Sequence, residues 1–182
     1  MKSRKNNSPM VQVFDHVLPE DLCHNLIDLF EDSEKNHEYF NDDYKPCFTQ
    51  LNLNQHNPEL VKVLVGFVQK AYGMYSVEVR RKHLPRLKSL EQFRLKRYLP
   101  GGEERFDEHV DVGNHESARR CLAFLFYLNN SDGETYFPEH DVTIHPKCGK
   151  VLVFPPTWEY PQIGRAHVRT PVTSLSRMPS SA

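Results

Sequence analysis

The sequence lacks three patterns that would each have indicated a distinct class of protein. Its cysteines never form a Cys-x-x-Cys pair, which excludes a zinc knuckle and a thioredoxin-type motif. No apolar run is long enough to cross a membrane, and the basic, polar residues 1–9 do not predict a secretory signal. We therefore expect a disordered lead over residues 1–9 and a protein of the reducing cytoplasm.

An excess of charge of one sign is also missing. The chain has 23 Lys and Arg against 24 Asp and Glu, a net charge of −1, so no global field favours nucleic acid as a partner. The most basic stretch, residues 80–88, has no interleaved aromatic residues for base stacking, which favours a solvated loop. A length of 182 residues with 38% hydrophobic and 26% charged residues suits one globular domain.

Two amphipathic helices are predicted in the first half of the chain. Pro19 and two acids begin the first, whose apolar stripe runs to about Phe30. Asn57 caps the second, which Gly73 is expected to end. The polar residues between these helices predict loop, with one candidate short strand at residues 47–53.

Short strands dominate the rest of the chain. Residues 92–98 alternate, with Phe93, Leu95 and Arg97 on one face and Arg94, Lys96 and Tyr98 on the other. The further predicted strands are residues 11–14, 105–111, 121–128, 134–138, 141–146 and 151–154. Two helices followed by many short strands predict an α+β fold, with helices packed outside a β-sandwich or jelly roll.

One pair of polar residues suits a metal. In His109-x-Asp111 alternate side chains of a strand leave the same face, with Cα atoms about 6–7 Å apart. An imidazole nitrogen and a carboxylate oxygen can therefore converge on one ion, and this donor set suits a borderline metal such as Fe(II).

Several short motifs follow one another along the second half of the chain. They are Tyr98-x-x-Gly101, Phe106-x-x-His109-x-Asp111, Phe126-Tyr127-Leu128-Asn129, Gly133-Glu134-Thr135-x-Phe137-Pro138, Pro146-x-x-Gly149, Val153-Phe154-Pro155 and Trp158-x-Tyr160-Pro161. In this order they resemble the 2-oxoglutarate- and Fe(II)-dependent dioxygenases of the prolyl-4-hydroxylase-like branch, and the similarity covers about residues 11–161.

The resemblance implies a double-stranded β-helix, or jelly roll, with an iron site at its mouth. It implies that His109 and Asp111 are two of three iron ligands and that Tyr98 and Thr135 line the 2-oxoglutarate pocket. The implied cofactors are Fe(II) and 2-oxoglutarate, with L-ascorbate as a candidate accessory. The implied reaction is O2-dependent hydroxylation of an aliphatic carbon in a peptide or small molecule, foremost a peptidyl proline.

The chain departs from the family at the third ligand. The family places a histidine directly after the Tyr-Pro of Trp158-x-Tyr160-Pro161, where this chain has Gln162. Residues 162–182 resemble translated sequencing-adapter DNA and lack the alternation of a closing strand. We hypothesise a native His at position 162, a truncated dioxygenase domain over residues 10–161 with its C-terminal strands missing, and a non-native tail over residues 162–182.

The residue that binds the far carboxylate of 2-oxoglutarate would follow about one strand after position 162, and the sequence does not identify it. His167, within the tail, is a weak candidate for the missing ligand. Two other functions are compatible with the same fold. One is a nucleic-acid demethylase with the same iron site, which the near-neutral charge disfavours, and the other is a non-catalytic jelly-roll binding module. The sequence carries no signal for the oligomeric state.

Overall fold

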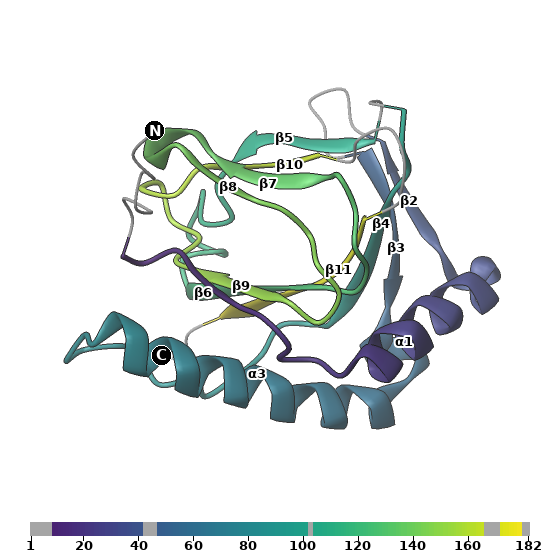
Figure 1. Cartoon of the computed structure of the whole chain (residues 1–182), viewed down its shortest axis with the longest axis horizontal. Coiled ribbons are helices and arrows are strands. Elements are labelled where there is room, and N and C mark those ends of the chain that lie inside the picture. Colours follow the sequence, from purple (N-terminus) through teal and green to yellow (C-terminus); the bar gives the residue numbers. More distant parts are fainter. Residues whose placement is uncertain (1–8, 42–46, 102–103, 166–171, 180–182) are drawn as a thin grey trace.

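The computed structural model describes residues 9–41, 47–101, 104–165 and 172–179, and its strands form two facing walls (Figure 1). The strands are β1 Gln12–Phe14, β2 Glu38–Asn41, β3 Cys47–Asn52, β4 Arg94–Tyr98, β5 Arg105–His109, β6 Arg120–Tyr127, β7 Glu134–Phe137, β8 Val142–Ile144, β9 Val151–Phe154, β10 Gln162–Arg165 and β11 Val172–Pro179. The helices are α1 Glu20–Asp32, α2 Leu53–His56 and α3 Pro58–Val79, with short 3-10 turns η1 Glu34–Asn36 and η2 Pro138–His140.

Antiparallel pairing joins these strands in the order β1-β9-β6-β11-β4-β3-β5-β10-β7-β8, with β2 paired to β3. Among the described residues of β3 and β5 one registered pair, Cys47 with Arg105, links the two strands, and this contact forms the corner between two sheets. The smaller sheet of β5, β10, β7 and β8 faces β6, β9 and β11 across the barrel, and β2–β4 close one side (Figure 1). The predicted α+β jelly roll is confirmed.

The helices cover the outer face of the larger sheet. Helix α3 runs along β6, β9 and β1, and α1 lies beside β3 (Figure 1). Leu26 and Phe30 of α1 and Leu64 and Val68 of α3 are buried in one apolar core that includes Leu95 of β4. Burial of each such side chain contributes roughly 1.5–3 kcal/mol. In the described ranges no helix, α3 included, combines the length and apolar content that a membrane crossing requires.

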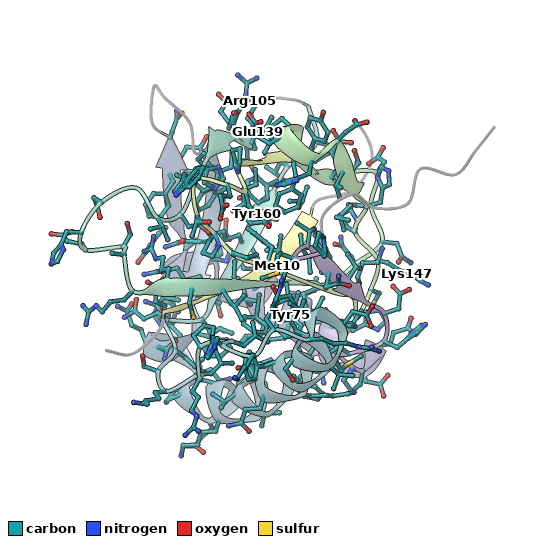
Figure 2. All side chains as sticks on the ribbon, turned by 90° about the vertical axis from the view of Figure 1, so that its left-hand side faces the viewer. Met10, Tyr75, Arg105, Glu139, Lys147 and Tyr160 are labelled. Atoms are coloured by element: carbon teal, nitrogen blue, oxygen red, sulfur yellow. The ribbon has the colours of Figure 1, made fainter. Side chains whose placement is uncertain are left out.

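The boundaries of α3 test the sequence-based prediction at both ends. The Asn57 side chain accepts a hydrogen bond from the Leu60 amide at 3.1 Å, which confirms the predicted cap. The predicted end at Gly73 is wrong, because the helix continues to Val79. Tyr75 lies beyond Gly73 and is fully buried, and its hydroxyl donates to the Met10 carbonyl at 3.0 Å (Figure 2). This tertiary contact outweighs the weak helix propensity of one glycine.

A second core fills the space between the two sheets. Phe137 of β7 and Phe154 of β9 meet edge to face with ring centroids 4.9 Å apart. Tyr98 belongs to this inner core, whereas Leu95 belongs to the core beneath the helices. The predicted alternation of residues 92–98 is therefore confirmed, and the even-numbered residues of β4 face the barrel interior.

Two features of the strand pattern differ from the sequence-based prediction. The expectation that the C-terminal strands are missing is wrong, because β10 and β11 lie within residues 162–182 and both pair on two sides. Strand β2 was also not predicted, and it pairs with β3 in a region expected to be loop. In each case the neighbouring strand supplies backbone partners, so pairing occurs without a strong side-chain pattern.

Some predictions about the termini lie outside the described residues. Of the predicted disordered lead, only Pro9 is described, and residues 166–171 and 180–182 of the predicted tail are not. The non-native origin of residues 162–182 stays a prediction.

Gly149 provides a test of the turn before β9. Its φ is 78°, and its carbonyl accepts hydrogen bonds from the Val17 and Leu18 amides at 2.8 and 3.1 Å. A Cβ at this position would collide with the Leu18 carbonyl oxygen. We expect Gly149→Ala to lower the free energy of unfolding by about 1–3 kcal/mol, measured by urea denaturation.

The matched control is Gly66→Ala in the middle of α3, where no heavy atom lies within 4 Å of the added Cβ. This substitution is expected to raise stability by up to about 1 kcal/mol, since alanine is the better helix former. Equal unfolding midpoints for Gly149→Ala and the parent chain would contradict the assignment of strain to this turn.

Candidate metal centre

His109 and Asp111 lie together at the end of β5. His109 is the last residue of the strand, and Asp111 lies just past it, so the predicted strand over residues 105–111 ends two residues early. The Nε2 atom of His109 is 3.6 Å from Oδ1 of Asp111, and the two side chains are 18% and 3% exposed. This separation is long for a hydrogen bond, but it suits two donors that each bind one cation at about 2 Å.

The orientation of the His109 ring is fixed by two contacts. Nδ1 lies 2.7 Å from the Asp107 carbonyl oxygen. A carbonyl can only accept, so Nδ1 must carry the hydrogen, and in the neutral ring Nε2 then has its lone pair available. The Phe106 ring stacks on the imidazole with centroids 3.5 Å apart and planes 9° apart. In the neutral ring the lone pair of Nε2 would face the Asp111 carboxylate, an arrangement that a cation between them would stabilise.

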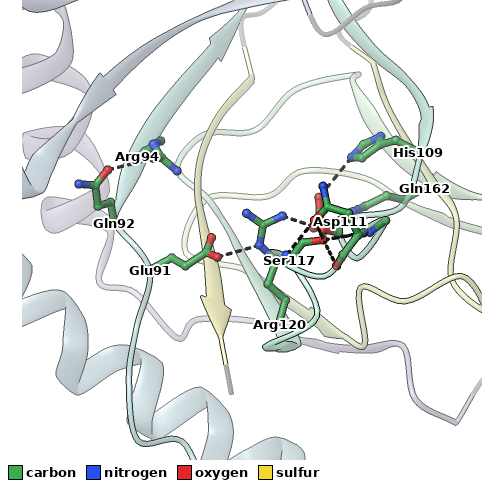
Figure 3. Close-up of polar contacts among 10 residues, drawn as sticks. Glu91, Gln92, Arg94, His109, Asp111, Ser117, Arg120 and Gln162 are labelled. Atoms are coloured by element: carbon green, nitrogen blue, oxygen red, sulfur yellow. Dashed lines mark hydrogen bonds and ion pairs between the residues drawn. The ribbon is translucent and has the colours of Figure 1, made fainter. Parts of the chain in front are cut away.

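Strand β10 brings a third side chain to the same place. Gln162 pairs with His109 across the strands, next to an irregularity in the register between Gln162 and Gly164. The Nε2 atom of Gln162 donates to Oδ2 of Asp111 at 3.3 Å, and both side chains are buried (Figure 3). The structure thus brings position 162, where the resemblance implies the third ligand, next to His109 and Asp111.

The residues present fit a divalent cation at two of three ligand positions. His109 and Asp111 supply the imidazole and carboxylate that Fe(II) favours. Gln162 points its amide nitrogen at the carboxylate, and its oxygen would face a metal only after the amide rotates. Across the ranges that the structure describes, no group of three His, Cys, Asp or Glu side chains could hold a metal. A cation held here would have two strong donors, His109 and Asp111, and at most one weak one, the Gln162 amide oxygen.

A polar network holds the loop that carries Asp111. Nη1 of Arg120 donates to the Asp111 backbone carbonyl at 2.6 Å, and Nε of Arg120 forms an ion pair with Glu91 at 2.7 Å (Figure 3). The Val112 amide donates to the Pro156 carbonyl at 3.0 Å. These contacts fix the backbone on both sides of the carboxylate, which limits the rearrangement needed on metal binding.

The two residues predicted to line the oxoglutarate pocket are both buried between the sheets. Tyr98 packs against Phe48 with ring centroids 5.4 Å apart. Thr135 lies on β7 opposite Gly164 of β10, and its Oγ1 is 2.7 Å from the hydroxyl of Tyr127. The structure thus places both in the barrel interior, and their contact with an oxo acid stays a prediction.

Tyr127 was not identified from the sequence as a site residue. It ends the apolar run of β6, which predicts a strand buried on both faces, and nothing in that run distinguishes a tyrosine with a polar role. Its side chain is fully buried, and burial raises the pKa of its hydroxyl, so it stays protonated and able to donate a hydrogen bond. Together, Tyr127 and Thr135 place two hydroxyls inside the barrel.

Comparison with known proteins gives matches to sequences and to folds. Residues 93–180 match the model of the 2OG-Fe(II) oxygenase superfamily. A protein of Acanthamoeba polyphaga mimivirus named "Putative prolyl 4-hydroxylase" is 38% identical over 78 residues, which cover 36% of this chain and 31% of that protein. The aligned segment thus spans about a third of the length of that curated relative.

Solved structures of three prolyl hydroxylases share the fold. The viral collagen prolyl hydroxylase of Paramecium Bursaria Chlorella virus-1, in complex with 2OG, has a TM-score of 0.70 at 18% identity, covering 95% of this chain and 97% of that chain. A Pseudomonas putida prolyl-4-hydroxylase has a TM-score of 0.70 at 15% identity, with 95% and 94% covered. A Trichoplax adhaerens prolyl hydroxylase, in complex with a hypoxia inducible factor peptide fragment, has a TM-score of 0.73 at 14% identity, with 96% and 84% covered.

Substitution of the weak third donor tests this metal site. We expect Gln162→His to tighten binding of Mn(II) or Co(II) by about tenfold or more, because an imidazole nitrogen is a far better ligand than a neutral amide. Isothermal titration calorimetry measures the change. The control is Gln69→His on the exposed surface of α3, which adds a histidine away from the site. An equal affinity in the parent chain and both variants would contradict a site at His109 and Asp111.

Proposed function

We propose, from the match of residues 93–180 to the model of the 2OG-Fe(II) oxygenase superfamily, that the chain is an Fe(II)- and 2-oxoglutarate-dependent dioxygenase. The reaction that we propose is hydroxylation of an aliphatic carbon, with a peptidyl proline as substrate. The observation that carries this proposal is the convergence of His109, Asp111 and position 162 at the mouth of a β-barrel. His109 is the last residue of β5, Asp111 lies in the loop after it, and position 162 begins β10, which pairs antiparallel with β5.

The chain's own residues would hold and shield the reacting centre. When bound, Fe(II) together with 2-oxoglutarate and O2 supplies the oxidising power that inserts oxygen into a C–H bond. Nε2 of His109 and the Asp111 carboxylate would hold the metal, and the Nδ1 hydrogen bond to Asp107 keeps the imidazole in the correct tautomer. Phe106, which stacks on His109, packs against the aromatic core between the sheets, so this side of the site would be shielded from water.

Support for a peptidyl proline comes from the relatives. The mimivirus protein is named for prolyl 4-hydroxylation, and the three structural neighbours are prolyl hydroxylases, one of them in complex with a peptide fragment. We propose the same class of substrate here, and L-ascorbate as an accessory reductant.

A second candidate function follows from Gln162. A neutral amide at the third ligand position weakens the metal site, so the chain with this residue would suit a jelly-roll module that binds a peptide without oxidising it. The two candidates differ in whether the chain converts 2-oxoglutarate to succinate.

Turnover of 2-oxoglutarate separates these candidates. With added Fe(II) we expect Gln162→His to form succinate, measured by NMR, at a rate at least about tenfold above the parent chain. Addition of a metal chelator should abolish the turnover. A Gln162→His chain that is folded, binds Mn(II) and yet forms no succinate would favour the binding module.

The role of His109 is tested in the same background. His109→Ala removes one of the two strong donors, so succinate formation should fall by about a hundredfold or more. The control is His115→Ala in the exposed loop that follows Asp111, which should leave the rate unchanged. If both alanine variants retained equal rates, His109 would not be a metal ligand.

A further inference from the structure

Two cysteines lie together where helix α1 meets the turn before β9. Cys23 is in the first turn of α1 and is fully buried, whereas Cys148 is partly buried in the turn and directly precedes Gly149. Both side chains pack in the apolar core beneath the helices, although more than a hundred positions separate them in the chain. Neither belongs to the candidate metal centre, so their proximity calls for a separate explanation.

Backbone hydrogen bonds hold the turn against the segment that enters α1. The Val17 and Leu18 amides donate to the Gly149 carbonyl at 2.8 and 3.1 Å. The Gly149 amide in turn donates to the carbonyl of Tyr127 at the end of β6, at 3.0 Å. The turn is thus fixed on one side to the approach of α1 and on the other to the larger sheet.

The backbone of each cysteine is also fixed. The Cys23 amide donates to the Pro19 carbonyl at 3.1 Å, which closes the first turn of α1 just after the segment that binds Gly149. The Cys148 amide donates to Oδ1 of Asn130 at 3.0 Å. The two thiols are therefore held near each other by contacts that do not involve sulfur, and their encounter requires no rearrangement of the fold.

The thiol of Cys148 lies close enough to that of Cys23 to change its acidity. Burial raises the pKa of Cys23 to about 12, and the neighbouring Cys148 thiol is the next largest cause. A buried thiol of this kind is protonated at neutral pH and reacts slowly with reagents from solution. Cys148 is the more exposed of the two, so a dissolved oxidant meets Cys148 first.

We propose that Cys23 and Cys148 are a redox-active pair, which a small-molecule disulfide such as oxidised glutathione converts to an intramolecular disulfide. The Cys148 thiolate attacks one sulfur of the oxidant, whose S–S bond breaks and releases one thiol. The Cys23 sulfur then loses its proton to water and attacks the Cys148 sulfur, which releases the second thiol. Two protein thiols are thereby oxidised, and one small disulfide is reduced to two thiols.

This disulfide joins α1 to the turn that leads into β9 and closes a loop of more than a hundred residues. A cross-link that closes a long loop restricts the unfolded chain, so the oxidised protein resists unfolding better than the reduced one. The pair makes the stability of the barrel depend on the redox state of its surroundings, whatever reaction the metal site performs.

Thiol counting in the folded, full-length chain tests the pair. The chain has four cysteines, and excess oxidised glutathione should lower the number of free thiols from four to two. The intact mass separates an internal disulfide from a glutathione adduct, and digestion without reductant should yield a peptide that links Cys23 to Cys148. The oxidised chain should melt about 5 °C or more above the reduced chain.

Variants show which thiols are required. Cys148→Ser removes the thiol that starts the exchange, so its melting temperature should be the same in oxidising and reducing buffer, and Cys148→Ala replaces it if the serine variant does not fold. The matched control is Cys121→Ser, which removes another partly buried thiol and should still form the disulfide. Cys121 lies near the start of β6, about 20 Å along the strand from Tyr127, to which the turn is bonded.

Each outcome supports the pair or overturns it. A linked Cys23–Cys148 peptide, together with a higher melting temperature that Cys148→Ser loses, supports it. Four free thiols in the folded chain after exposure to excess oxidant would overturn it, and so would a disulfide between any other two cysteines. A glutathione adduct on Cys148 that never proceeds to the internal disulfide would also overturn it, since Cys23 would then be out of reach.

Discussion

The antiparallel pairing of β10 with β5 is the constraint on which the candidate site depends. This pairing sets Gln162 beside His109, and the amide of Gln162 reaches the carboxylate of Asp111. Residues more than fifty positions apart in the chain therefore meet because of backbone hydrogen bonds, and no metal is needed to bring them together. The rest of the barrel supports this pair, since β7 flanks β10 on its other side and the helices support the opposite sheet.

Charged side chains lie both at the metal pair and in a cavity next to it. The metal pair is a carboxylate beside an imidazole, and a cavity of about 390 Å³ next to it is lined by charged side chains that include Arg94, Lys96 and Glu38. The partly buried Phe106 ring stacks on His109 and also lines the cavity.

The sequence predicted those elements whose pattern depends on residues close together in the chain. The cap at Asn57 and the alternation of β4 are examples, because a hydrogen bond and a buried face depend on residues close in the chain. Strand β11 and the burial of Tyr127 and Lys96 depend on distant neighbours instead. A lysine in an alternating strand usually indicates the solvent face, and only the tertiary structure places Lys96 under two aromatic rings.

The position of β11 has a consequence for the order of folding. It is the last of the described strands, yet it lies between β4 and β6 in the interior of the larger sheet. During synthesis on the ribosome, β4 and β6 would therefore each have one unpaired edge until this segment emerges. Such late, long-range closure slows folding and prolongs exposure of the unpaired edges to other chains.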